Sequence, residues 1–253
     1  MRIAVVTGAS SGMGKEFVQQ ISRTEKLDEI WVIARRIDRL EELKKEITST
    51  VIRPISLDLT KEERLETYRA MLEAEKPDVA ILMNASGFGK FGTFTEMSLD
   101  SMMSMIDLND KAYVAMTYLT LPYMKEGGEI YQLDSLSSFQ PVPYIGVYGA
   151  TTAFVLSFSR ALNVELKKRK IKVMAVCPGW VKTEFFDHAV HDDTIVYYNK
   201  FFTAEGVITR ALRDMKRGKD VSVCGASIRA QVLLTKLLPH RIVMKIWCMQ
   251  QKK

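Results

Sequence analysis

Short apolar runs alternate along this chain with longer amphipathic segments, and this alternation restricts the fold more than any other feature. The runs at 2–7 and 29–34 read RIAVVT and EIWVIA, without the polar alternation of a half-exposed strand. Continuous apolarity is typical of parallel strands that are buried on both faces. The segment after the first run places Phe17, Val18 and Ile21 at helical spacing. Parallel strands joined by helices form a sheet covered by helices on both faces.

The same pattern continues over most of the chain. Strands are expected at 2–7, 29–34, 51–57, 78–83, 129–133, 172–177 and 220–223. Helical segments are expected near 98–125, 147–170 and 203–217, and Thr60 with Glu63 predicts a further helix start. We predict a Rossmann-type, doubly wound parallel α/β sheet of about seven strands. We expect one dinucleotide-binding and catalytic domain over residues 1–225, with residues 226–253 as a basic amphipathic extension packed on it.

A glycine-rich segment directly follows the first predicted strand and opens the next helix. Residues 7–14 read TGASSGMG, so the glycines have the spacing G-x-x-x-G-x-G. Glycine lets a backbone turn sharply and approach a ligand closely, and the N–H groups at a helix start attract phosphate. We predict that this loop binds the pyrophosphate of a dinucleotide rather than forming an ordinary tight turn. The residues expected to hold it are Gly8, Ser10, Ser11, Gly12, Met13 and Gly14.

The end of the second predicted strand indicates which dinucleotide is bound. NAD sites commonly place an acidic residue there, on the ribose 2′-hydroxyl. This chain has Arg35 and Arg36 instead, and guanidinium groups suit a 2′-phosphate. We therefore predict NADP(H), with two merely solvated arginines as the alternative. Asp58 and Leu59, after the third strand, are expected near the adenine.

Composition places the chain among globular proteins. Hydrophobic residues make up 47% and charged residues 26%, which does not suit a disordered chain. The longest apolar runs are too short to span a bilayer, and Met1 leads into a strand-like segment rather than a secretion signal. The three cysteines are far apart and odd in number, which suits neither a metal site nor a disulfide framework. We expect a cytoplasmic protein.

The net charge of +6 is concentrated near one end of the chain. Six basic residues and no acidic residue follow Asp220, so the preceding part is neutral overall. This distribution argues against nucleic-acid binding, which usually needs a basic face over the fold. Apolar residues recur at helical spacing on both sides of Pro239, with Trp247 in the second stretch. We favour helices packed on a second subunit or over a substrate site, with a helix at a membrane interface as the alternative.

Further motifs follow the glycine loop in an order that resembles the short-chain dehydrogenase/reductase family over nearly the whole chain. Residues 7–14 match that family's TGxxxGxG loop. Asn109, Ser135 and Tyr148 are similar to three members of its catalytic tetrad, and the last two have its separation of 13 residues. Two segments resemble its cofactor-binding motifs and comprise Asn84, Ala85, Ser86 and Gly87, and Pro178, Gly179, Val181 and Thr183.

This resemblance implies an oxidoreductase that interconverts a ketone and a secondary alcohol. Tyr148 would be the acid/base, Ser135 would orient the carbonyl, and Asn109 would support them. One position departs from the family, whose tyrosine is followed four residues later by a lysine, whereas this chain has Thr152. A threonine can hydrogen-bond the cofactor ribose but brings no charge to favour the phenolate. We therefore expect alcohol oxidation to suffer more than ketone reduction.

Three explanations of Thr152 stay open at this point. Another cation takes the lysine's place, or the chain is a cofactor-binding pseudoenzyme or regulatory scaffold without turnover, or position 152 was substituted in the laboratory. We favour the first and third over the second because Asn109, Ser135 and Tyr148 are all present.

The resemblance also suggests which segments border a substrate. Residues 88–92 and 183–188 are rich in aromatic side chains, which favours an apolar small molecule such as a steroid or a fatty acyl ketone. Lid packing alone is the alternative. His188 and His191 are interpreted as part of a solvated loop rather than a metal site. Members of this family usually associate with further subunits through the helices around positions 109 and 152. The resemblance therefore implies a homo-oligomer, either a dimer or a tetramer.

Overall fold

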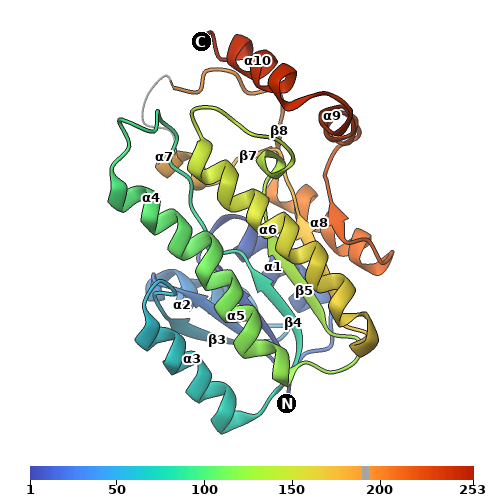
Figure 1. Ribbon diagram of the computed structural model, residues 1–253. Coiled ribbons are helices and arrows are strands. Elements are labelled where there is room, and N and C mark those ends of the chain that lie inside the picture. Colours follow the sequence, from blue (N-terminus) through green and yellow to red (C-terminus); the bar gives the residue numbers. More distant parts are fainter. Residues whose placement is uncertain (190–193) are drawn as a thin grey trace.

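The central element of the molecule is a parallel sheet that was predicted from the apolar runs. The computed structural model describes residues 1–189 and 194–253, and within these a seven-stranded sheet has the order β3-β2-β1-β4-β5-β6-β9 (Figure 1). All its pairings are parallel. The strands are β1 (Arg2–Thr7), β2 (Glu29–Ala34), β3 (Val51–Ser56), β4 (Asp78–Asn84), β5 (Glu129–Leu133), β6 (Lys172–Val176) and β9 (Val221–Ser222). The doubly wound fold class is therefore confirmed.

Two hydrophobic cores, one on each face of the sheet, explain why the strands are apolar throughout. Along β1, Ala4 and Val6 belong to one core, whereas Ile3 and Val5 belong to the other. Successive side chains of a strand point to opposite faces, so a strand covered on both faces is mostly apolar and admits polar residues only where they find hydrogen-bond partners.

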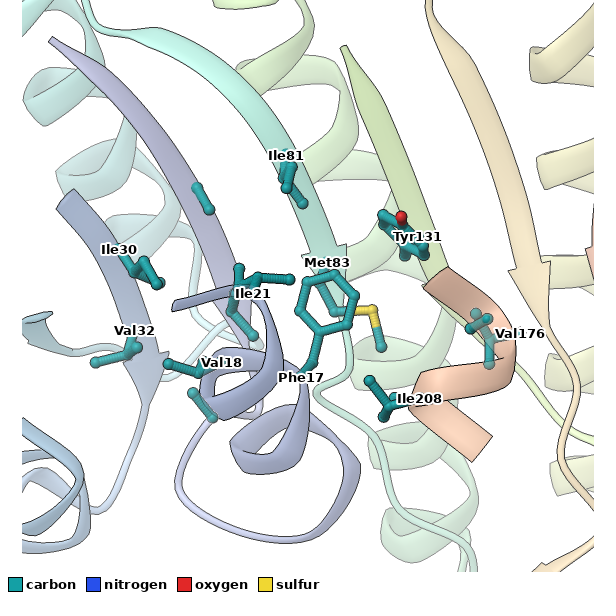
Figure 2. Packing of buried hydrophobic residues seen from close by; sticks show 14 of the residues in the cluster. Phe17, Val18, Ile21, Ile30, Val32, Ile81, Met83, Tyr131, Val176 and Ile208 are labelled. Carbon is teal, nitrogen blue, oxygen red and sulfur yellow. The ribbon is translucent and has the colours of Figure 1, made fainter. Parts of the chain in front are cut away.

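Helices cover both faces. The first core contains buried residues of α1 (Gly12–Thr24), α2 (Ile37–Glu46) and α8 (Ala204–Lys216). Figure 2 shows Phe17, Val18 and Ile21 of α1 directed at apolar side chains of the strands. The second core contains buried residues of α3 (Glu62–Glu75) and α5 (Ala112–Thr120), and Leu162 of α6 (Gly146–Glu165) packs against it.

The helical region predicted near 98–125 is divided into pieces. Ser98 caps α4 (Leu99–Ile106) by accepting from the Ser101 N–H. A π-helical turn at Asp107–Lys111 then leads into α5, and a 3₁₀ turn at Leu121–Tyr123 ends the region. Such π turns inside α-helices occur frequently at functional sites, and this one contains Asn109.

The predicted Thr60 N-cap is wrong. Helix α3 begins at Glu62, and Lys61 is its N-cap residue without a side-chain hydrogen bond. The Thr60 hydroxyl instead donates to Asp58 Oδ1 at 2.7 Å. The hydroxyl is thus used in the turn that precedes the helix, because an aspartate two residues back competes for it.

The last part of the chain lies beyond the carboxyl ends of the strands, away from the N-terminus (Figure 1). It comprises β7 (Trp180–Val181), α7 (Phe185–Ala189), β8 (Phe201–Phe202), α9 (Ala226–Leu237) and α10 (His240–Gln250). Trp247 Nε1 donates to the Pro143 carbonyl at 3.0 Å, and Gln251 Oε1 accepts from the N–H groups of Val196 and Tyr197. Among the described residues, none of the helices is long and apolar enough to cross a bilayer. His191 and the side chain of His188 lie outside the described residues.

Candidate active site

The glycine loop forms a tight cradle at the carboxyl end of β1. Gly8 has a φ of +66°, and a Cβ built on it would lie 2.4 Å from the Ala85 carbonyl oxygen at the end of β4. A Cβ on Gly14 would lie 2.4 Å from the Gly8 oxygen. Thr7 Oγ1 fixes the two strand ends together by accepting from the N–H groups of Ala85 and Ser86 at 3.0 and 3.1 Å. Only glycine fits these positions.

The start of α1 is suited to an anionic ligand. Ser11 is the N-cap residue, and its side chain makes no capping hydrogen bond to the first turn. The N–H groups of that turn therefore keep their capacity to bind a phosphate. The glycines place no side chains in the loop, and the loop leads directly into these N–H groups. The residues present therefore fit the pyrophosphate of a dinucleotide.

The two arginines after β2 occupy different surroundings. Arg36 donates to the hydroxyls of Ser10 and Ser11 at 3.1 and 3.0 Å, and it forms an ion pair with Glu184 at 2.9 Å. This guanidinium thus lies directly against the glycine loop. Arg35 is exposed near Asp58. Burial raises the pKa of Asp58. Hydrogen bonds from Thr60 and the nearby cations lower this pKa by more than burial raises it, so the net shift is downward.

The structure brings the three predicted catalytic residues to one cavity of about 440 Å³. Asn109, Ser135 and Tyr148 all line it, together with Met13 of the glycine loop. The other sequence-predicted cofactor residues on its wall are Ala85, Gly87, Thr152, Pro178, Gly179, Val181 and Thr183. Residues from the loop after β1, the ends of β4, β5 and β6, and α6 therefore meet in one place.

Two predicted cofactor residues have buried side chains directed elsewhere. Asn84 Nδ2 donates to Thr117 Oγ1 and Gln132 Oε1 at 3.1 and 2.8 Å, so its amide joins β4 to α5 and β5. Leu59 belongs to the second hydrophobic core. Their side chains therefore stabilise the sheet and its surroundings.

The surroundings of Tyr148 favour the neutral form of its phenol. Burial raises the pKa of Tyr148 above its ordinary value of 10.0, a hydrogen bond with Ser135 lowers it, and the neighbouring Asp134 raises it again. The net direction is upward. The site is therefore suited to hold the proton on Tyr148 and to donate it, rather than to form a phenolate near neutral pH.

Asn109 connects the loop after β4 to α6. Its Nδ2 donates to the Phe88 carbonyl at 3.0 Å and to Thr151 Oγ1 at 3.1 Å. Its Oδ1 accepts from the Phe88 N–H at 3.1 Å. All polar atoms of the amide are thus engaged, so this residue fixes the relative position of loop and helix.

Thr152 occupies the position of the family's lysine, and its hydroxyl lies beside that of Ser137. Thr152 is 5% exposed, donates to the Gly149 carbonyl at 2.9 Å and lies 3.0 Å from Ser137 Oγ. Among the described residues that line the cavity, none is Lys, Arg or His. The described wall of the cavity therefore carries no basic side chain.

The sequence interpretation missed a buried carboxyl beside Ser135. Asp134 is 5% exposed, lines the cavity and accepts from Cys177 Sγ at 3.3 Å. Its other oxygen has no hydrogen-bond partner among the described residues. Burial raises the pKa of Asp134 well above its ordinary value, and nearby Asp110 adds to the shift, whereas the Cys177 hydrogen bond lowers it. An acidic residue directly after a buried strand was the available signal.

Aromatic and aliphatic side chains complete the cavity. The ring of Tyr148 lies 5.6 Å from that of Phe185 and 5.9 Å from that of Phe91, measured between centroids. Trp180 also lines the cavity. The far wall comes from the C-terminal helices and consists of Gln231, Leu234, Thr235, Leu238, Val243, Ile246, Trp247 and Gln250. These residues of the tail thus pack against the cavity, whereas packing on a second subunit, the other arrangement that the sequence left open, stays a prediction.

A parallel sheet with a glycine cradle at the carboxyl end of its first strand defines a nucleotide-binding fold of the Rossmann type. The family model described as short chain dehydrogenase matches residues 2–194. The chain belongs to this family of oxidoreductases, as the motifs predicted.

Similar proteins agree with that assignment. The NADP-dependent 3-hydroxy acid dehydrogenase of Schizosaccharomyces pombe is 32% identical over 198 residues, which cover 75% of each chain. The very-long-chain 3-oxoacyl-CoA reductase of Bos taurus is 31% identical over 72% of this chain and 60% of its own length. A solved short-chain dehydrogenase from Sphingobium yanoikuyae in complex with NADPH covers 94% of both chains, with a TM-score of 0.81 and 26% identity.

Proposed function

We propose that this chain is an NADP(H)-dependent oxidoreductase that interconverts a ketone and a secondary alcohol on an apolar substrate, and that it works mainly as a reductase. The observation that carries this proposal is the common cavity lined by Ser135, Tyr148 and the glycine-loop residue Met13. A proton donor, a second hydroxyl and a nucleotide cradle are the parts that carbonyl reduction requires.

The preference for NADP(H) rests on Arg36. Its guanidinium contacts both loop serines, so it lies beside the nucleotide cradle, where a 2′-phosphate would be recognised. Glu184 forms an ion pair with this guanidinium. A 2′-phosphate would either displace the Glu184 carboxylate or bind the guanidinium together with it. Asp58 remains the candidate for a contact near the adenine. The yeast relative named above is NADP-dependent, and the Sphingobium neighbour was solved with NADPH.

The chemistry follows from the protonation state of the site. Bound NADPH supplies a hydride to a carbonyl carbon. Tyr148 holds its proton up to high pH and donates it to the carbonyl oxygen, while Ser135 gives that oxygen a second hydrogen bond. Asn109 keeps the surrounding loop and helix in register. Reduction leaves Tyr148 as a phenolate, which regains a proton from solvent before the next turnover. Oxidation must start from that phenolate, which a site without a cation disfavours.

An apolar substrate fits the lining of the cavity. Phe91, Trp180, Phe185 and the apolar residues of α9 and α10 surround the space beyond Tyr148. Burial of an aliphatic chain or a fused ring system against such walls stabilises the complex. The bovine relative is named a very-long-chain 3-oxoacyl-CoA reductase, which supports a fatty acyl ketone; a steroid-like ketone rests on the apolar lining alone.

The test combines binding and turnover. NADPH and NADH are titrated by fluorescence, and NADPH oxidation is then followed with a panel of medium-chain ketones, 3-oxoacyl thioesters and ketosteroids. We expect tighter binding of NADPH and measurable reduction of apolar ketones. Binding without oxidation of any ketone favours the second candidate, a cofactor-binding regulatory protein, for which Thr152 is the specific observation. Absence of binding to either nucleotide contradicts both.

Two further parts of the proposal concern the assembled state and the compartment. Exposed apolar residues lie on neighbouring helices of one side, with Val114 and Tyr118 on α5 and Phe154 and Val164 on α6. Such a surface supports a homo-oligomer, which light scattering would test. The free cysteines support a reducing, cytoplasmic location, which localisation of a tagged protein in cells would test.

A further inference from the structure

The outer surface of α9 and α10 is unusually apolar for a surface in contact with water. Leu237 is 73% exposed and Met249 is 65% exposed. Leu233, Ile242 and Ile246 are exposed on the same two helices. Several large apolar side chains exposed on two consecutive helices are the kind of surface that marks an interaction site. We call these five residues, together with the basic residues that follow, the α9–α10 surface.

The α9–α10 surface is also uniformly basic. Its exposed charged residues are Lys236, Arg241, Lys245, Lys252 and Lys253. No acidic residue occurs after Asp220. Within the described residues, none of these five side chains has a carboxylate within ion-pair distance. Lys236 and Lys253 lie over the rings of Phe139 and Tyr144, each at 5.7 Å from the ring centroid, and no acidic partner neutralises the five charges among the described residues.

The candidate cavity adjoins this surface. Leu234 and Ile246 line the cavity, and both are also exposed to solvent. The inner side of α10 is held in place by Trp247 and Gln251, which hydrogen-bond the Pro143 carbonyl and the backbone at 196–197. Figure 1 shows both helices at the end of the molecule farthest from the N-terminus. A ligand that leaves the cavity on this side meets the apolar residues first.

We propose that the α9–α10 surface docks on an anionic lipid bilayer, and that the apolar substrate enters the cavity from that bilayer. Exposed leucine, isoleucine and methionine side chains can insert at the acyl boundary, while lysine and arginine contact anionic headgroups. The docking is independent of the proposed function, whereas substrate entry rests on it.

A second copy of the chain is a less suitable occupant. A symmetric contact would place this surface against itself. Ten or so uncompensated positive charges would then face one another, and juxtaposed like charges disfavour association. An anionic bilayer satisfies both the apolar and the basic residues of the surface.

Vesicle flotation of the full chain tests the docking. Vesicles of phosphatidylcholine alone are compared with vesicles that also contain about one third phosphatidylserine. We expect flotation with the anionic vesicles, and at least about tenfold weaker partition for the charge-reversed variant Arg241→Glu/Lys245→Glu, since each basic residue near such a surface contributes substantially. The matched control Lys44→Glu/Lys45→Glu on α2 changes the net charge equally and should float like the parent chain.

The apolar contribution is tested with Leu237→Glu against Val51→Glu, an exposed apolar residue on β3. Only Leu237→Glu should lose flotation. Both variants should reduce a small water-soluble ketone at the rate of the parent chain. Failure of the parent chain to float, equal losses in the paired variants, or a change of oligomeric state in Leu237→Glu without a change in flotation would overturn the docking. Flotation without any ketone reduction would leave the docking intact and refute the proposed function.

Discussion

Replacement of Thr152 by lysine should raise the rate of alcohol oxidation about 10²-fold while changing ketone reduction by less than about tenfold. Thr152 lies four residues after Tyr148 on α6, so both side chains are on the same face of the helix. An ammonium about 5 Å from the phenol oxygen interacts with a phenolate by about 3 kcal/mol at an effective dielectric constant of about 20. This energy corresponds to about two pKa units, and hence to about 10² more phenolate at a given pH.

The measurement is the ratio of kcat for alcohol oxidation to kcat for ketone reduction on one preparation, both at saturating substrate and cofactor, because the kcat/KM values of the two directions are tied together by the equilibrium constant. Lysine at 152 loses the threonine's hydrogen bonds to Gly149 and Ser137 and is inserted at a buried position. Some loss of folded protein is expected, but it cancels in the ratio of oxidation to reduction. The pH profile of oxidation should also move down by about two units, because the pKa of Tyr148 is raised in the parent chain.

Two control variants separate charge from size. Thr152→Met has a side chain of similar length to lysine without its charge, and Ser157→Lys places the charge at an exposed position on the same helix. Neither should change the ratio. If Thr152→Lys leaves the ratio unchanged, or if Thr152→Met raises it equally, the electrostatic account of position 152 is refuted.

Three other changes test the cradle, the cofactor preference and the core. Gly8→Ala forces a Cβ against the Ala85 carbonyl at a φ of +66°, so nucleotide binding should be lost in a fluorescence titration and the melting temperature should fall. Arg36→Ala should weaken NADPH about tenfold or more and NADH little; equal losses would assign Arg36 a structural role. Asp214→Asn should destabilise the fold by about 2 kcal/mol in urea at pH 7, since it leaves Arg210 and Lys219 without their buried carboxylate. Burial raises the pKa of Asp214, but hydrogen bonds from Arg210, Lys219 and Ser222 lower it to a net downward shift. The difference should therefore disappear as the pH falls below the ordinary value of 3.8, and a difference that persists in acid contradicts this ion pair.

The sheet could be predicted because each strand carries its own signal. A run such as RIAVVT is buried on both sides, and the structure shows Ile3 and Val5 in one core and Ala4 and Val6 in the other. The glycine loop could also be predicted from its sequence, because the fold requires glycine there. At position 8, a φ of +66° and a Cβ contact of 2.4 Å exclude any other residue. Information that is local in sequence was thus sufficient for these elements.

Features that depend on distant partners were not predictable. The sequence does not reveal that Asn84 uses its amide within the core, because its partners Thr117 and Gln132 lie on other elements. Nor does it reveal that Asp134 is enclosed beside Cys177. The apolar pattern of the tail predicted helices, but only the tertiary structure places Leu234 and Ile246 on the cavity wall.

The division of the cavity wall between two parts of the chain has a consequence for how such proteins diversify. The family model covers residues 2–194, which contain Ser135 and Tyr148, whereas the wall residues of α9 and α10 all lie beyond it. Reaction chemistry and ligand choice can therefore change separately. Exchange of the last two helices between relatives would change this part of the wall and leave Ser135 and Tyr148 in place.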